Sequence, residues 1–514
     1  MKNWWPLVAV CLGSLMLLVD VTIVNVALPA MALDLSASFS DLQWVVDGYA
    51  LVLAATLLAA GTIGDRLGHR RVYLAGLVLF AVASLASGLA GDVALLVAAR
   101  CVQGIGGAAM FATTFALLNA SYQGRARGTA YGVWGAVGGA AAALGPIVGG
   151  VLTEHAGWRW IFFVNLPVTA LTVALCLTAL AADHGRATSR LDVPGLVTFT
   201  AFAAALTYGL IEAGGRGWGD ARPVVSFAVA AVALLAFVLV ERRAAAPMLD
   251  LALLRQRVFT GTLVAATAAS LVAFSALVFV SIWLQSVQGL SPIEAGLAGG
   301  VPLSAAALVT SAAGPRLLHG RPPGPVIAAG VGLIGLGALL MALQLSGAAG
   351  WPALTAGLVV TGVGVGTTFP VLSSTAMSTV PLQRGGMAAG AVNTARQLGL
   401  ALGLAVLGTV LTSSLSSTLA GRGVPHPGAV AQALAGGQAR AVTALAGGHR
   451  VVDTAFVAAL REVMGVAGAV GVVAAVVVAA LLRPGRTTAA PAGRAVPTGR
   501  EEGRVPDAVV ASGS

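Results

Sequence analysis

Long apolar runs, separated by short segments rich in charged residues, proline or glycine, make up most of the chain. A helix needs about 20 apolar residues to cross a bilayer. Cutting the sequence at each polar interruption therefore predicts fourteen membrane-spanning helices. Their expected ranges are 7–28, 44–64, 72–91, 94–119, 128–152, 160–182, 193–212, 223–240, 259–284, 293–315, 325–345, 353–377, 388–413 and 458–482. The pattern is typical of an all-α integral membrane protein.

Composition agrees with lipid surroundings. Of 514 residues, 58% are hydrophobic and 9% are charged, whereas soluble domains carry about 25% charged residues. This number of charged residues is too small to cover a surface exposed to water. The apolar residues that a core cannot accommodate must therefore face lipid. The net charge of +10 does not indicate a nucleic-acid partner, because the basic residues lie in short loops and a tail rather than on one face.

The distribution of basic residues predicts the orientation. With the N-terminus inside, 20 of the 29 Lys and Arg residues fall on the cytoplasmic side and 7 on the other. Cytoplasmic loops carry the excess of Lys and Arg in membrane proteins. An even number of spans then places both termini of this cell-membrane protein in the cytoplasm.

Nothing in the sequence indicates a metal or cofactor. Cys11, Cys101 and Cys176 lie in apolar runs without metal-ligand spacing, and the six histidines lie in loops or at helix ends. Haem or redox-metal ligands would need a spaced pair within the spans. We therefore expect no cofactor and no metal, and find no catalytic constellation that would make the chain an enzyme.

Loop lengths predict the division into domains. Two six-helix bundles are expected at 1–182 and 259–482, with two extra helices at 193–241 and a cytoplasmic linker at 242–258 that carries four arginines. Residues 414–452, rich in Ala, Gly and Ser, are expected to form a long external loop, partly disordered or weakly helical. Residues 483–514 have the Pro, Gly and charge content of a disordered cytoplasmic tail.

A glycine-spaced charged loop, GTIGDRLGHRR, joins the second and third predicted helices. Its glycines permit close helix approach, and its aspartate can make charge-assisted contacts with its arginines to latch the cytoplasmic side. The alternative is a simple turn with a positive-inside anchor. The spacing resembles the signature loop of the major facilitator superfamily, with His69 as the one departure. The expected latch residues are Gly61, Asp65, Arg66, Gly68 and Arg70.

Further segments resemble the fourteen-helix drug:proton antiporter family of that superfamily. They are Leu18–Pro29, Asp41–Leu51, Arg100–Met110, Gly138–Gly150, Trp158–Pro167, Leu284–Leu297 and Arg384–Gly403. The resemblance covers residues 7–482, and seven motifs in the right order are far more specific than any one glycine-rich piece. It implies two pseudo-symmetric six-helix bundles with two extra central helices, and export of a solute.

Asp20 and Arg100 are the expected proton-coupling residues. An ionisable side chain within a span is costly, by roughly 2.5–3.5 kcal/mol, and usually lines a cavity or a proton path. Burial of Asp20 favours its neutral form and hence proton capture; the alternative is a carboxylate paired only for packing. Arg100 needs a carboxylate or several carbonyls around it, unless it snorkels to the outer interface. In the resembled family these positions are the coupling carboxylate and an arginine that influences proton release.

The segment GPIVGG, Gly145 to Gly150, places a proline within the fifth predicted helix. Proline removes a backbone hydrogen bond, and the glycines admit a neighbouring helix. The resemblance makes this the antiporter motif, a kink that seals the cavity between states; an ordinary packing kink is the alternative. Its residues are Gly145, Pro146, Gly149 and Gly150.

Polar residues within or at the ends of spans are expected to line a substrate cavity. They are Asn25, Gln103, Glu212, Asn393, Arg396 and Gln397. Glu212 has the alternative role of an interfacial charge, and the last three that of interhelical hydrogen bonding.

Together these features predict a proton-coupled antiporter, acting as a monomer, that exports small lipophilic drugs or antibiotics by alternating access. The alternative is an uptake symporter or facilitator for a nutrient, which would share the fold and the loop latch. The GPIVGG segment and the two extra helices favour export.

Overall fold

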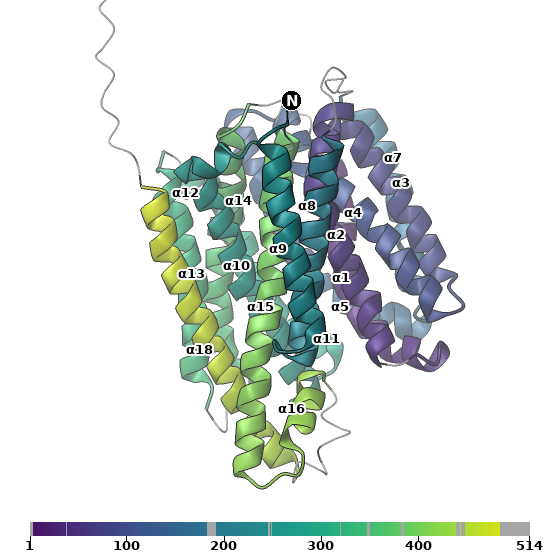
Figure 1. Cartoon of the computed structure of the whole chain (residues 1–514), viewed down its shortest axis with the longest axis vertical. Coiled ribbons are helices and arrows are strands. Elements are labelled where there is room, and N and C mark those ends of the chain that lie inside the picture. The colour runs from purple at the N-terminus through teal and green to yellow at the C-terminus, as the bar shows by residue number, and fades with distance from the viewer. Residues whose placement is uncertain are drawn as a thin grey trace, which may run out of the picture.

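A computed structural model describes residues 4–37, 39–181, 192–244, 247, 249–318, 320–346, 350–381, 385–437, 443 and 448–483. Within these ranges the chain is almost entirely helical and contains no strand, in agreement with the predicted all-α class (Figure 1). The tail beyond residue 483 lies outside the described residues, as do parts of the loops.

The long helices follow the predicted order of spans. Those of the first half are α1 Trp5–Asp34, α2 Phe39–Leu67, α3 His69–Gly88, α4 Val93–Ser121, α5 Gly124–His155, and the pair α6 Trp160–Phe163 and α7 Asn165–Ala179. Next come α8 Val193–Arg216 and α9 Ala221–Glu241. The second half has α10 Arg257–Ile282, α11 Pro292–Ala295, α12 Val301–Leu317, α13 Pro323–Gln344, α14 Thr355–Ser378, α15 Gly385–Gly421, α16 Pro427–Ala435 and α18 His449–Leu481.

Thirteen helical segments in the described part of the chain are long and apolar enough to cross a membrane. The one predicted span without a counterpart among the thirteen is the fifth, 128–152, which corresponds to α5. Its 32 residues extend about 48 Å at the α-helical rise, more than the roughly 30 Å hydrocarbon core of a bilayer. The chain is a multi-pass membrane protein.

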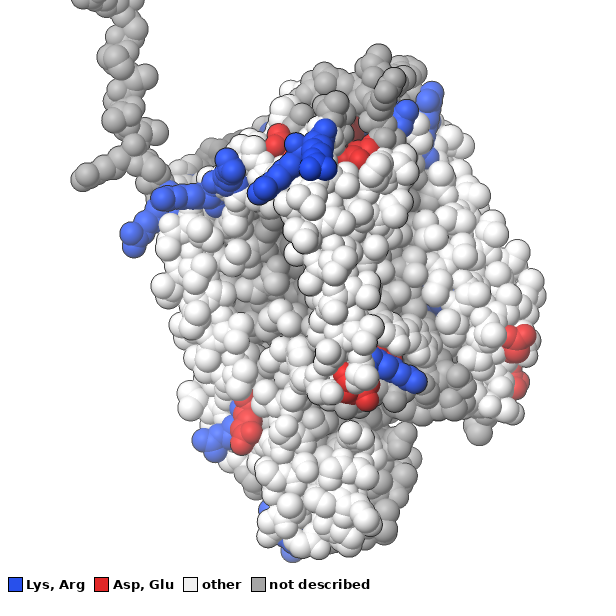
Figure 2. Space-filling model, in the orientation of Figure 1, with Lys and Arg blue, Asp and Glu red and all other residues white. Residues whose placement is uncertain are grey.

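The outer surface has the character of a lipid-facing wall. Large apolar side chains project outward from several helices, including Val232 on α9, Val309 on α12 and Leu343 on α13, each more than 60% exposed. Figure 2 shows a broad face almost free of charge, with Lys and Arg gathered towards one end of the bundle and smaller charged clusters at the other. Such a surface is stable only against hydrocarbon.

Two large apolar cores lie side by side. One is built mainly from α1–α9 and the other from α10–α18. Between them, α2 packs against α15, while α5 packs against α12 and α14. We call this boundary the seam. The α8–α9 hairpin lies along it, because α8 contacts both α2 and α15 (Figure 1).

The segment predicted as a long loop at 414–452 is more helical than expected. Helix α15 continues to Gly421, α16 follows, and α18 already begins at His449. Leu415, Leu419 and Leu434 are fully buried in the second core, so these turns keep an apolar face that packs. Residues 438–442 and 444–447 lie outside the described residues.

Candidate functional site

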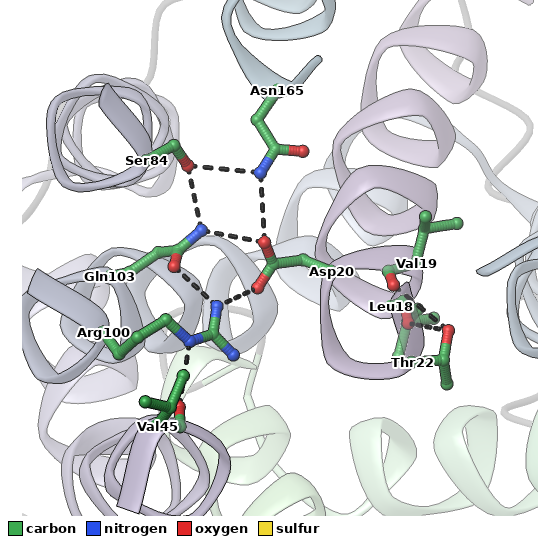
Figure 3. A network of polar contacts seen from close by, with 9 residues as sticks. All are labelled: Leu18, Val19, Asp20, Thr22, Val45, Ser84, Arg100, Gln103 and Asn165. Atoms are coloured by element: carbon green, nitrogen blue, oxygen red, sulfur yellow. Dashed lines mark hydrogen bonds and ion pairs between the residues drawn. The ribbon is translucent and has the colours of Figure 1, made fainter. Parts of the chain in front are cut away.

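Asp20 lies at the centre of a buried polar network in the first half (Figure 3). The residue is 1% exposed. Its Oδ2 atom accepts from Arg100 Nη1 at 2.5 Å, and its Oδ1 atom accepts from Gln103 Nε2 at 2.9 Å and from Asn165 Nδ2 at 3.0 Å. Three N–H donors therefore meet one carboxylate, and both of its oxygen atoms accept hydrogen bonds.

Arg100 is the cationic partner in this network. It is 1% exposed, so it does not snorkel to the interface. Its Nε donates to the Val45 carbonyl at 3.1 Å, its Nη1 donates to Gln103 Oε1 at 2.6 Å, and its guanidinium lies 4.3 Å from the centre of the Tyr49 ring. Of the two surroundings expected for Arg100, a carboxylate or several carbonyls, the structure shows the carboxylate, together with one backbone carbonyl.

Ser84 on α3 and Asn165 on α7 belong to the network although the sequence did not single them out. Gln103 and Asn165 both donate to Ser84 Oγ, at 2.9 Å and 3.2 Å. Asn165 is the first residue of α7, immediately after the break at Val164 that separates it from α6. The only signal in the sequence was its place in the motif Trp158–Pro167, because hydrophobic periodicity does not reveal which helices face one another.

Aromatic side chains close the network from solvent. Tyr49 is 2% exposed and Phe162 is fully buried, with the Arg100 guanidinium 5.8 Å from the Phe162 ring centre. The ion pair consequently lies in a region of low dielectric constant, where the interaction between the two charges is stronger than in water. A proton on Asp20 would remove the negative charge of the ion pair and so change the hydrogen bonds of the whole network.

The predicted latch loop connects the two halves. Asp65 accepts at Oδ2 from the backbone N–H of Met387 in the first turn of α15 at 2.9 Å, and its Oδ1 lies 3.3 Å from His69 Nε2. A carboxylate at a helix N-terminus satisfies an otherwise free N–H and interacts favourably with the helix dipole. The aspartate thus joins α2 to α15 across the seam, a contact that the sequence did not predict.

Other latch residues keep the α2–α3 turn in place. Gly68 has a φ of 98°, a conformation that favours glycine, and its N–H donates to the Gly64 carbonyl at 2.9 Å. Arg70 Nη2 donates to the Leu177 carbonyl at the end of α7 at 2.8 Å. Gly61 and Arg66 lie in the last two turns of α2. Their latch function stays a prediction.

Replacing Asp65 by Ala should open the seam at this end of the bundle. Loss of a helix cap costs about 1 kcal/mol, roughly a fivefold shift in a two-state equilibrium. Spin labels at the exposed positions Leu67 and Val258, with the three native cysteines replaced by Ala, should then show a larger long-distance population. The control Asp65→Asn keeps a side-chain oxygen that can accept the Met387 N–H hydrogen bond, so the long-distance population should increase less in this variant. An unchanged distance distribution in Asp65→Ala would show that the contact is not a latch.

The predicted antiporter motif packs α5 tightly against α1. A Cβ atom at Gly145 would lie 1.8 Å from Thr22 Oγ1, and one at Gly149 would lie 2.9 Å from Ile23 Cγ1. Thr22 and Ile23 follow Asp20 by less than one turn, so this contact adjoins the polar network. Helix α5 is continuous through the motif to His155 and includes Gly150. The Pro146 side chain lies outside the described residues, and its kink stays a prediction.

A second polar cluster lies on α15. Asn393 is fully buried and donates to the Phe111 carbonyl at 3.4 Å, which links α15 to α4. Arg396 Nη1 lies 3.5 Å from Asn393 Oδ1. Gln397 is the next residue and is partly buried. The structure therefore brings Asn393 and Arg396 together at the seam, although not with Asp20.

The remaining predicted cavity residues lie elsewhere or are not described. Glu212 Oε2 lies 3.8 Å from Arg222 Nη1, an ion pair at the α8–α9 turn, as expected for its alternative role as an interfacial charge. The Asn25 side chain lies outside the described residues. Gln103 belongs to the Asp20 network, so its contribution to a substrate cavity stays a prediction.

Comparison with known proteins identifies the family. The family model for the Major Facilitator Superfamily matches residues 10–404. The chain belongs to the major facilitator superfamily. A solved transporter structure shares its fold: the human organic anion transporter MFSD10 (TETRAN) superposes with a TM-score of 0.61 at 15% identity, covering 92% of this chain and 99% of that one.

Within the superfamily, several curated relatives are named for resistance and export. The tetracenomycin C resistance and export protein of Streptomyces glaucescens is 35% identical over 493 residues, 93% of this chain and 91% of the relative. The multidrug resistance protein Stp of Mycobacterium tuberculosis is 36% identical and covers 82% of this chain and 79% of its own length. The puromycin resistance protein pur8 of Streptomyces alboniger is 35% identical, with 82% and 84% covered.

Proposed function

We propose that this superfamily member exports small lipophilic drugs or antibiotics in exchange for protons. The names of the resistance and export relatives support the direction and the substrate class. Both termini would lie in the cytoplasm, as the excess of Lys and Arg at one end of the bundle suggests. A single chain would carry out the cycle, because two bundles and the seam between them are all that alternating access requires.

The buried Asp20 network supports the proton-coupling part of the proposal. Asp20 is 1% exposed and bonded to side chains from α4 and α7. A proton on the carboxylate removes the negative charge that Arg100 neutralises, so the contacts holding α1 to α4 weaken. Deprotonation restores them. One group therefore has two states with different interhelical contacts, which is the physical requirement for coupling.

The packing around Asp20 can transmit the change in α1–α4 contacts to the seam. Helix α1 contacts α5 through Thr22 and Ile23 against Gly145 and Gly149, and α5 contacts α12 and α14 in the second half. A shift of α1 on protonation would move α5 with it, because atoms this close cannot slide independently. We infer that the proton state of Asp20 biases which side of the seam is open.

The proposal is tested by the direction of transport in intact cells. Cells expressing the protein should accumulate less of at least one of puromycin, tetracenomycin C and ethidium than cells with an empty vector, and a proton uncoupler should remove the difference. Lower accumulation of at least one compound supports export. Higher accumulation would instead support the alternative function, an uptake symporter or facilitator. An uncoupler-resistant difference would contradict proton coupling.

A further inference from the structure

Arg100 and Arg396, both within membrane-spanning helices, have different surroundings: Arg100 is buried, and Arg396 is partly buried. Arg100 has a carboxylate partner at 2.5 Å. Arg396 has none within 4 Å among the described residues; its side-chain polar contact is Asn393 Oδ1 at 3.5 Å, and its Nε atom is buried without a hydrogen-bond partner. One cation is thus neutralised within the described chain and the other is not.

Aromatic rings surround the Arg396 guanidinium. Its Cζ atom lies 4.4 Å from the ring centre of Phe369, 5.7 Å from that of Phe111 and 6.0 Å from that of Trp134. Phe369 belongs to α14 in the second half, whereas Phe111 and Trp134 belong to α4 and α5 in the first. The guanidinium therefore lies at the seam, where a superfamily transporter holds its solute between repeats.

The unpaired charge needs compensation. A guanidinium stays protonated in proteins, so Arg396 cannot become neutral as a buried lysine can. The aromatic faces attract the cation, but they accept no strong hydrogen bonds and replace only part of its hydration. A group that brings negative charge and oxygen acceptors would complete the site.

Carboxylates elsewhere in the described chain do not serve this purpose. Asp20 is engaged by Arg100 within the first half. Glu212 pairs with Arg222 at the α8–α9 turn, near Trp218, which bonds Thr409 on α15. Thr409 is thirteen residues beyond Arg396, or about 20 Å along the helix. The compensating anion must therefore come from outside these groups.

We propose that Arg396 binds the anionic group of an aromatic substrate, a carboxylate or an acidic phenol, while Phe369, Phe111 and Trp134 hold its rings. Trp134 Nε1 donates to Ser14 Oγ at 2.9 Å, which fixes that ring in its place. The guanidinium offers paired N–H donors that match a planar carboxylate. This inference rests on the proposed export function and specifies the chemical class of its substrate.

The proposal has a consequence for energy coupling. If one proton enters as one monoanion leaves, each of the two movements is equivalent to the transfer of one positive charge into the cell. The membrane potential, negative inside, therefore drives both of them. Export of a monovalent cation by the same exchange would be electroneutral. Collapsing the potential with valinomycin and potassium at constant pH gradient should therefore strongly reduce export of an anion.

Equilibrium binding to the purified full-length protein in lipid nanodiscs tests the site without requiring transport. The probes are pyrenebutyrate, pyrenebutanol and pyrenebutylamine, which share one aromatic body and differ in charge. Energy transfer from protein tryptophan reports binding. We expect the carboxylate to bind at least tenfold more tightly than the alcohol, and the amine to bind most weakly. Arg396→Gln should weaken carboxylate binding at least tenfold and alcohol binding less than threefold, with Arg396→Lys between.

The matched control is Arg422→Gln, which removes one exposed arginine bonded to Thr454 and should leave all three affinities unchanged. Equal binding of the three probes to the wild type would overturn the proposal. So would a loss in Arg396→Gln that is the same for all three, because this would make Arg396 a structural contact. Failure of proton-driven export with the charge preference intact would count against the proposed function, not against this site.

Discussion

Replacing Asp20 by Asn should abolish proton-driven export and leave substrate binding in place. Asparagine has nearly the same shape and still accepts hydrogen bonds from Gln103 and Asn165 through its oxygen, but it carries no titratable charge. Without two charge states, α1 has no proton-dependent change in its contacts with α4. Drug accumulation in cells expressing Asp20→Asn should equal that of the empty vector, while binding of the pyrene probes should stay within about threefold of wild type, roughly 0.6 kcal/mol.

The same substitution leaves Arg100 buried beside an amide instead of a carboxylate. Breaking a buried ion pair by removing one partner destabilises proteins by about 3–5 kcal/mol. A second variant is therefore needed to separate loss of coupling from loss of stability. The double variant Asp20→Asn/Arg100→Gln removes both charges and should unfold at a higher temperature than Asp20→Asn while remaining inactive in export. Active export by the double variant would show that neither residue couples protons.

Replacing Gly145 by Ala should reduce both stability and export. The added Cβ would lie 1.8 Å from Thr22 Oγ1 and 2.8 Å from Thr22 Cβ. The Thr22 hydroxyl donates to the Val19 carbonyl at 3.1 Å, which holds it in this position. Overpacking of this kind costs about 1–3 kcal/mol, and separating α1 from α5 also displaces the adjoining Asp20. We expect a lower unfolding temperature and at least a tenfold loss of export at equal expression.

The same helix provides a matched control. A Cβ at Gly138 would lie 3.6 Å from Leu18 Cδ1, an ordinary van der Waals contact. Gly138→Ala should therefore keep export and gain up to about 1 kcal/mol, because alanine has a higher helix propensity than glycine. If Gly145→Ala behaved like Gly138→Ala, the close α1–α5 contact would not matter for transport.

Much of the fold could be predicted from the sequence. Apolar run length predicts the all-α membrane class and the order of the spans, because hydrocarbon requires each crossing segment to satisfy its own backbone hydrogen bonds. The segment 414–452 was less predictable. Its alanine and glycine content is typical of a loop. Leu415 and Leu419 nevertheless lie on one helical face and pack into the second core, which only the tertiary structure provides.

The candidate site was predictable only in part. Asp20 and Arg100 stand out because charges within spans are costly, and the structure brings them together. Ser84 and Asn165 are ordinary polar residues on other helices, and hydrophobic periodicity does not reveal that they join the Asp20 network. The contact from Asp65 to Met387 joins positions 322 residues apart, a distance that local patterns do not bridge.

Substrate-induced proton movement in everted membrane vesicles tests the central claim most directly. Puromycin and pyrenebutyrate would be added to energised vesicles containing equal amounts of wild type or Asp20→Asn protein, and the release of protons from the lumen would be followed with a pH-sensitive dye. We predict proton release on addition of a transported substrate in the wild type and none in Asp20→Asn. Full proton release together with uphill substrate transport in Asp20→Asn would contradict the assignment of Asp20 as the coupling carboxylate.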